Sequence, residues 1–155
     1  MVTFRQAIRT DVPAIVEMIA DDKLGKTRED FKMPLPNSYY TAFENITSDS
    51  NQELIVVESE NLEIIGTFQL SFIQYLTYQG GIRAQIEAIR IRKDERGGGL
   101  GTKMFEYAIE RTKQRKAHVL QLTTDKQRPG ALHFYKKLGF IDSHEGMKLH
   151  FRYDK

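Results

Sequence analysis

The sequence predicts an α/β fold: one mixed, mostly antiparallel, twisted sheet of about seven strands flanked by about four helices. Some segments alternate apolar and polar residues, as strands do, and others carry apolar residues at helical spacing. Their order is strand, two helices, three strands, helix, strand, helix and a terminal hairpin. No internal repeat, low-complexity tract or linker interrupts the 155 residues. We therefore expect a single domain over residues 1–155.

The N-terminal elements are the first strand and the first two helices. Residues 2–8 alternate polar and apolar side chains, which predicts a strand. Asp11 and Pro13 mark the start of a helix. Residues 21–36 are polar and are expected to form a loop or a short helix. Apolar residues spaced over 39–46 predict the second helix.

Three strands follow in the central part of the chain. Leu54 to Glu58 and Ile64 to Tyr75 flank a polar turn and indicate a hairpin. Gly80 and Gly81 then turn the chain into a strand over Ile82 to Arg92.

The strand over residues 82–92 changes its side-chain parity. Its apolar residues stand first on even positions and then on odd ones: Ile82, Ala84, Ile86, Ile89 and Ile91. Because side chains alternate strictly between faces, this change indicates one extra residue, a β-bulge in the fourth strand between Ile86 and Ile89. A strand buried on both faces is the alternative, and it would need no bulge.

The C-terminal part carries a glycine-rich loop, two helices and three strands. A helix with an apolar stripe starts at Leu100, and Ala117 to Thr124 is the next strand. Pro129 opens the last helix, which ends at Gly139. Phe140 to Ile141 and Met147 to Tyr153 are expected to form the terminal hairpin.

Composition limits the class of protein. The chain has no cysteine, which excludes disulfide scaffolds, thiol nucleophiles and thiolate metal sites. Mean hydropathy is −0.49, and no apolar run approaches the roughly 20 residues of a membrane span. The N-terminus does not resemble a signal peptide, so we expect a cytoplasmic protein without a membrane partner. The 23 basic and 21 acidic side chains nearly balance, which argues against nucleic-acid binding.

The segment from Arg96 to Gly101 has the character of a phosphate-binding loop. It joins a strand to a helix, and glycines let backbone amides approach an anion at a helix N-terminus. The segment does not match a P-loop, because Gly101 is followed by Thr102 and Lys103. It also lacks the third glycine of the dinucleotide fingerprint, since Thr102 occupies that place.

The pattern that remains is Arg-x-x-Gly-x-Gly, at Arg96, Gly99 and Gly101. It resembles the acetyl-coenzyme A pyrophosphate loop of the GNAT superfamily of N-acetyltransferases. Residues 131–140 resemble a second signature of that family, and the element order matches over nearly the whole chain. The resemblance implies transfer of an acetyl group from acetyl-CoA to a primary amine, by direct attack in a ternary complex and without a metal.

The same resemblance implies positions for coenzyme binding. The backbone of Ile89, Arg90 and Ile91 would pair with the pantetheine arm, and Arg96 would contact the pyrophosphate. Thr124 would replace an Asn contact that many members have, because Arg128 stands at that place. Backbone amides of the loop would hold the pyrophosphate: Gly97, Gly98, Gly99, Leu100, Gly101 and Thr102.

The resemblance also implies three catalytic groups. Glu87 is the candidate base that takes a proton from the amine, and its alternative reading is a solvent-facing carboxylate. The Ile89 amide is the candidate donor to the developing oxyanion. Tyr135 is the candidate acid for the leaving thiolate, and the alternative is a core tyrosine.

The acceptor amine is not identified by the sequence. A small molecule and a protein amino group both remain open, because the charges of residues 20–40 nearly cancel. A noncatalytic acyl-CoA-binding regulator is the alternative function. The alternating segment Met147 to Tyr153 resembles a dimerising strand of the family, so we expect a homodimer.

Overall fold

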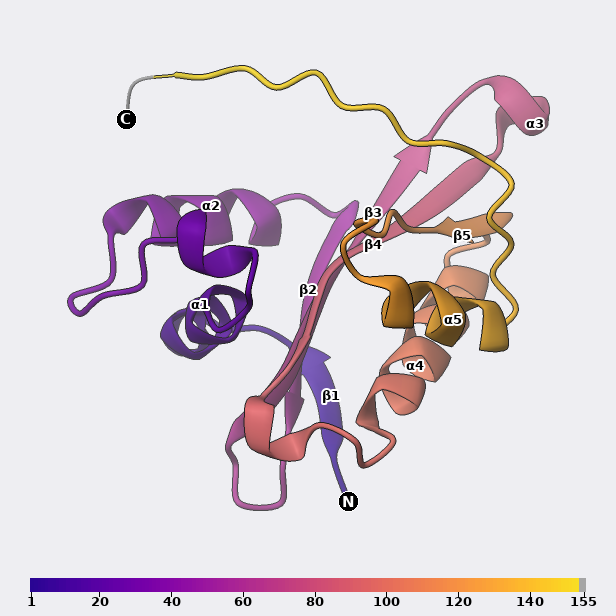
Figure 1. Cartoon of the computed structure of the whole chain (residues 1–155). Helices are drawn as coiled ribbons and strands as arrows, with labels where there is room; N and C mark the ends of the chain where they lie inside the picture. The colour runs from indigo at the N-terminus through magenta and orange to yellow at the C-terminus, as the bar shows by residue number, and fades with distance from the viewer. Residues whose placement is uncertain (154–155) are drawn as a thin grey trace. The chain divides into compact units, whose positions relative to one another are not determined.

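The computed structural model describes residues 1–153 in two compact units, residues 1–122 and residues 123–153. No helix in the described part of the chain is long and apolar enough to cross a membrane. Figure 1 shows the elements of both units. In chain order they are β1 (Thr3–Gln6), η1 (Arg9–Asp11), α1 (Val12–Ala20), η2 (Gly25–Thr27), α2 (Asn37–Thr47), β2 (Gln52–Glu58), β3 (Ile64–Gln74), α3 (Thr77–Gly80), β4 (Ile82–Ile91), η3 (Lys93–Glu95), α4 (Leu100–Gln114), β5 (Val119–Gln121) and α5 (Pro129–Lys137).

The first unit is a five-stranded sheet between two layers of helices. The strand order is β1-β2-β3-β4-β5, and all neighbours are antiparallel except β4 and β5. Consecutive residues of β2, Val56 and Val57, are both fully buried, so both faces of the sheet are covered there. α1 and α2 pack on the face of Val56, whereas Met104 of α4 contacts Gly66 on the other face (Figure 1).

The bulge predicted from the parity change is confirmed. Thr67 pairs with Arg90, and Gln69 pairs with Glu87. An interval of two residues on β3 therefore lies opposite an interval of three residues on β4. Ala88 takes up the extra residue with a φ of 53°, in the left-handed region that non-glycine residues rarely adopt. Glu87 and Ala88 are exposed, which excludes the alternative of a strand buried on both faces at this point.

The second unit contains α5, which ends as predicted. Gly139 has a φ of 99° and follows the last helical residues. Its amide donates to the Lys136 carbonyl at 3.0 Å, and the Phe140 amide donates to the Tyr135 carbonyl at 3.1 Å. These two bonds form a Schellman motif, which requires a left-handed residue and therefore favours glycine.

The predicted seven strands and four helices are wrong in part. Among the described residues the sheet has five strands, and neither Phe140–Ile141 nor Met147–Tyr153 forms one. The apolar side chains of the latter segment are 69–95% exposed. Alternation predicts a strand only where a neighbour satisfies its amides and carbonyls, and the sequence does not show that neighbour.

Two smaller differences lie in the first unit. β5 is shorter than the predicted 117–124, because it ends at Gln121. The expected turn at Gly80 and Gly81 is the four-residue α3, in which Tyr78 and Gln79 have left-handed backbones. This tight turn at the tip of the β3–β4 hairpin accounts for the fifth helix.

Candidate functional site

The glycine loop between β4 and α4 presents unpaired backbone donors. Gly97 and Gly99 have φ values of 82° and 86°, and Gly99 caps α4 without a side-chain bond. The first amide to bond within the helix is that of Lys103, at 3.4 Å from the Gly99 carbonyl. The amides of Leu100, Gly101 and Thr102 precede it and therefore have no intrahelical acceptor.

The space above the loop is open. Among residues 1–153, a Cβ added at Gly97 or Gly99 would meet no heavy atom within 4 Å. Unpaired amides at the positive end of a 15-residue helix favour a negatively charged group. The loop therefore fits a phosphate or pyrophosphate, as its sequence predicts.

Beyond the bulge, one edge of β4 pairs with β3, and the other edge faces away from β3. β5 pairs with β4 only at Arg83 to Gln85, and β4 continues to Ile91. The Arg92 amide donates to Ile65 of β3 at 2.9 Å, so the backbone groups of Ile89 and Ile91 point to the opposite edge. Such an edge can pair with an extended ligand.

Two guanidinium groups donate hydrogen bonds to backbone carbonyls on this edge. Arg90 Nη1 donates to the carbonyl of Ile89 at 2.8 Å, and Arg96 Nε donates to that of Ile91 at 3.0 Å. Arg90 also forms an ion pair with Asp22, 3.2 Å from Nη2 to Oδ2. The Arg90 side chain thus joins the 21–36 segment to the bulged strand, a role that the sequence did not indicate.

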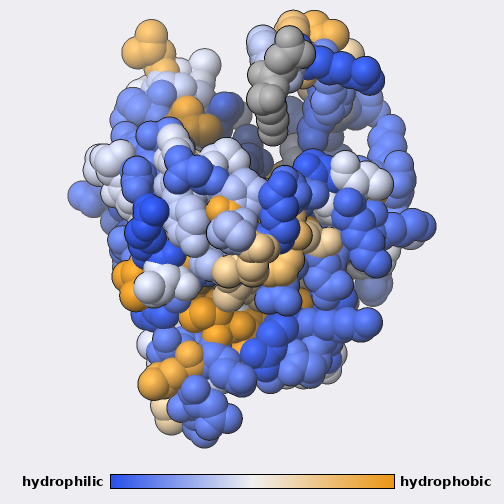
Figure 2. All heavy atoms as spheres, turned by 90° about the vertical axis from the view of Figure 1, so that its left-hand side faces the viewer, coloured by the Kyte–Doolittle hydropathy of each residue, from blue (hydrophilic) through white to orange (hydrophobic). Residues whose placement is uncertain are grey.

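Arg96 lies beside a cavity of about 610 Å³ in the first unit. The expected pyrophosphate contact of Arg96 is compatible with this exposed position at the start of the loop. Figure 2 shows the face with α1 and α2, where orange apolar surface lies among blue polar surface. The cavity wall has the same mixed character: Ala14, Glu17, Met18, Ala20, Asp21, Lys26, Glu29, Phe31, Ile64, Ile91, Arg92, Lys93 and Arg96.

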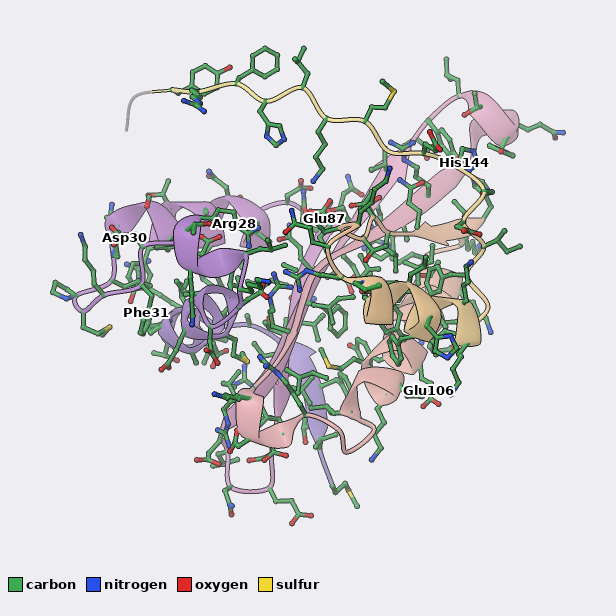
Figure 3. The ribbon with its side chains drawn as sticks, in the orientation of Figure 1. Arg28, Asp30, Phe31, Glu87, Glu106 and His144 are labelled. Carbon is green, nitrogen blue, oxygen red and sulfur yellow. The ribbon has the colours of Figure 1, made fainter. Side chains whose placement is uncertain are left out.

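Glu87 lies on β4 next to the bulge, with its side chain exposed (Figure 3). Its cross-strand partner is Gln69 of β3, and directly opposed side chains share a face of the sheet. Gln69 Nε2 donates to Gln52 Oε1 at 2.7 Å, and Ser71 Oγ donates to the same oxygen at 2.9 Å. The candidate base therefore stands beside neutral hydrogen-bonding groups.

This polar surface continues across β4 to β5. Gln121 Nε2 donates to Gln85 Oε1 at 2.7 Å, and Gln85 shares the face of Glu87, two residues away. We call the set the polar row: Gln52, Gln69, Ser71, Gln85, Glu87 and Gln121. The alternation of Gln69 and Ser71 indicated polar positions on β3, but the cross-strand register that assembles the row is visible only in the structure.

Thr124 and Tyr135 belong to the second unit. Thr124 follows the end of β5 and is half-buried. Tyr135 lies on α5, also half-buried, with its ring 5.7 Å from that of Phe134 and 6.1 Å from that of Phe140. The first unit thus holds the predicted loop, strand edge and Glu87, and the second holds the candidate acid. The roles of all these residues stay predictions.

Comparisons with known proteins agree with this architecture. A Bacillus halodurans structure described as a transcriptional regulator is 52% identical, with a TM-score of 0.94, over 97% of this chain and 100% of that one. A structure from Clostridium acetobutylicum described as a predicted acetyltransferase with acetyl-CoA has a TM-score of 0.74 at 24% identity. It covers 97% of this chain and 96% of that one, and at this identity it shows the fold alone.

Sequence comparisons give the family. An uncharacterised N-acetyltransferase of Methanocaldococcus jannaschii is 40% identical over 57 residues, 37% of this chain. The match spans only a quarter of that relative's length. Residues 20–140 match the model of the acetyltransferase (GNAT) family. Because this match extends over most of the chain and includes the bulged strand and the glycine loop, the chain belongs to the acetyltransferase (GNAT) family.

Proposed function

We propose that the chain is an N-acetyltransferase that transfers an acetyl group from acetyl-CoA to a primary amine of a small molecule or a protein. The observation that carries this proposal is the continuous run from the bulge at Ala88 to the amides at the start of α4. A strand edge to which β5 does not extend and an anion-binding helix N-terminus follow each other within this run. They match the two parts of the coenzyme, an amide-bearing arm and a pyrophosphate.

Acetyl-CoA supplies an activated thioester. For the acceptor, Glu87 is the proposed base that takes the proton of the amine, and its exposed position beside the bulge supports this role. The Ile89 amide, on the outward edge of β4, is the donor for the negative charge that develops on the acetyl oxygen. Tyr135 of the second unit is the proposed proton donor to the leaving thiolate.

A noncatalytic acyl-CoA-binding regulator is the second candidate. It is favoured by one observation, the 52% identity to a protein described as a transcriptional regulator. Such a module would bind acetyl-CoA and release no thiol with any amine. The near balance of 23 basic and 21 acidic residues gives no support for direct nucleic-acid binding.

The test combines a binding measurement with a turnover measurement. Acetyl-CoA at 100 times its dissociation constant should stabilise the fold by about 2.7 kcal/mol, which raises the melting temperature by roughly 5–10 °C. Thiol release over a panel of amines then separates the two candidates. A shift without turnover would support the regulator and contradict the enzyme.

Tyr135→Phe examines the chemical step in single turnovers. The substitution keeps the ring contacts with Phe134 and Phe140 and removes only the hydroxyl. The rate should fall by roughly 10²–10⁴. Tyr153→Phe, at a residue 81% exposed in the same unit, is the matched control. A Tyr135→Phe rate within about threefold of wild type would leave Tyr135 as a packing residue.

A further inference from the structure

Arg83 is a half-buried cation on β4 that has no carboxylate partner among the residues the structure describes. No carboxylate lies within ion-pair distance of its guanidinium among residues 1–153. Its Nε is buried and has no hydrogen-bond partner in that same part of the chain. Its guanidinium lies over the ring of Tyr75, with Cζ 5.5 Å from the ring centroid. A partly desolvated guanidinium without an anion is unfavourable, so an anionic partner from outside would stabilise it.

Arg83 shares a face of the sheet with the polar row. Arg83, Gln85 and Glu87 oppose Ile73, Ser71 and Gln69 in unbroken register. The bulge comes only after Glu87, so the three β4 side chains point to the same side. A cation and a carboxylate therefore lie at the two ends of one line of side chains, with amides and a hydroxyl beside them.

The spacing along this line sets a ligand length. Glu87 lies four residue steps after Arg83 along β4, which corresponds to about 13 Å between their Cα atoms. The Arg83 guanidinium leans toward Tyr75, away from Glu87, and the hydrogen bond at each end of a ligand spans about 3 Å, so a ligand of about 10 Å would contact both. An extended chain of three amino-acid residues has this length.

The groups between the two charges suit peptide-like amides. Each glutamine side chain has two donors and two acceptor lone pairs. The bonds of Gln69 to Gln52 and of Gln121 to Gln85 use only part of that capacity. The remaining donors and acceptors can bond to amide or hydroxyl groups of a ligand that lies along β4.

We propose that the acceptor is a peptide-like amine with an anionic group about 10 Å from its nitrogen. The amine lies at Glu87, the anionic group at Arg83, and the polar row binds the part between them. Arg83 is thus a specificity-determining residue for the acceptor. This inference rests on the proposed acetyl transfer, because Glu87 is its reference point.

Oligoglycines and their C-terminal amides are the probes. Thiol release is measured with glycine, diglycine and triglycine, and with triglycinamide, which keeps the amine and lacks the negative charge. We expect kcat/KM to rise with length to triglycine, and triglycine to exceed its amide by about tenfold to a hundredfold, the range for hydrogen bonds to a charged group. Arg83→Gln should reduce that ratio to within about twofold.

Arg115→Gln is the matched control. Arg115 also stacks on an aromatic ring, 4.2 Å above Phe72, and Phe72 lies on the opposite face of β3 from Ser71. This variant should retain the wild-type preference for triglycine over its amide. Equal rates for acid and amide in the wild type, or an unchanged ratio in Arg83→Gln, would overturn the proposal.

Calorimetry with the same peptides separates the acceptor site from the chemistry. If triglycine binds the acetyl-CoA-loaded protein better than triglycinamide, and Arg83→Gln removes the difference, the acceptor site stands even where no thiol is released. In that case the proposed acetyl transfer is contradicted. If triglycine neither binds nor reacts while other amines are acetylated, the peptide-like acceptor is overturned and the acetyl transfer stands. If no amine binds or reacts, both are overturned.

Discussion

Gly99 should tolerate an L side chain poorly for two separable reasons. Its φ of 86° lies in the left-handed region, where an L residue costs about 1–2 kcal/mol. For a chain of this size, each kcal/mol lowers the melting temperature by about 2–4 °C. Gly99→Ala should therefore melt about 2–8 °C below the wild type. The loss comes from backbone strain, because the added Cβ meets no atom of the described residues within 4 Å.

Coenzyme binding is the second reason, and Gly99→Asn isolates it. Asparagine adopts left-handed backbone more readily than alanine, so this variant should recover most of the melting temperature. Its side chain still projects over the amides that would hold the pyrophosphate. We expect acetyl-CoA to stabilise Gly99→Asn far less than it stabilises the wild type, as measured by thermal melts with and without coenzyme.

Gly98→Ala is the control for both effects. Gly98 does not have positive φ, and a Cβ there would lie 4.0 Å from the nearest assigned atom, the Glu95 carbonyl oxygen. This variant should melt at or slightly above the wild-type temperature. If Gly99→Ala and Gly98→Ala have the same melting temperature, the predicted backbone strain at Gly99 is refuted. If acetyl-CoA stabilises the wild type and Gly99→Asn equally, the phosphates do not lie at this loop.

Three further predictions concern coenzyme affinity, pH and assembly. Arg96→Ala should weaken acetyl-CoA binding by about 1.5–3 kcal/mol in calorimetry, and unchanged affinity would remove Arg96 from the site. Although burial opposes it, hydrogen bonds from Arg5 and the Ile8 amide hold the pKa of Asp11 below its usual value. Asp11→Asn should therefore lose about 1.5–3 kcal/mol of unfolding free energy near neutral pH, as measured by urea unfolding. The difference from the wild type should shrink below about pH 4, and a pH-independent difference would contradict this. The exposed apolar side chains of 147–153 favour a homodimer, so light scattering should give twice the 18.0 kDa of one chain, and a monomer at micromolar concentrations would exclude it.

Much of the fold of both units was predictable because the patterns that specify it are local. The parity change between Ile86 and Ile89 predicted the bulge, since alternation is imposed by strand geometry itself. Gly139 predicted the end of α5, since a left-handed residue there favours glycine. Such features depend on a few neighbouring residues and need no knowledge of the remaining chain.

The features that were missed depend on partners distant in sequence. The segment 147–153 alternates like a strand but forms none in the described residues, because alternation does not supply a neighbouring strand. The polar row joins Gln52 of β2 to Gln121 of β5 through cross-strand register. The ion pair of Arg90 with Asp22 spans 68 residues, and the unmatched charge of Arg83 is visible only once its surroundings are assembled.

We propose that this chain binds acetyl-CoA at the bulged strand and glycine loop and transfers its acetyl group to an amine. The most direct measurement is thiol release from acetyl-CoA with an amine panel, using wild type and Glu87→Gln at matched coenzyme saturation. We expect amine-dependent thiol release by the wild type and a rate about 10²-fold or more lower in Glu87→Gln, with acetyl-CoA affinity unchanged. Amine-independent or absent release by a wild type that is saturated with acetyl-CoA would contradict it.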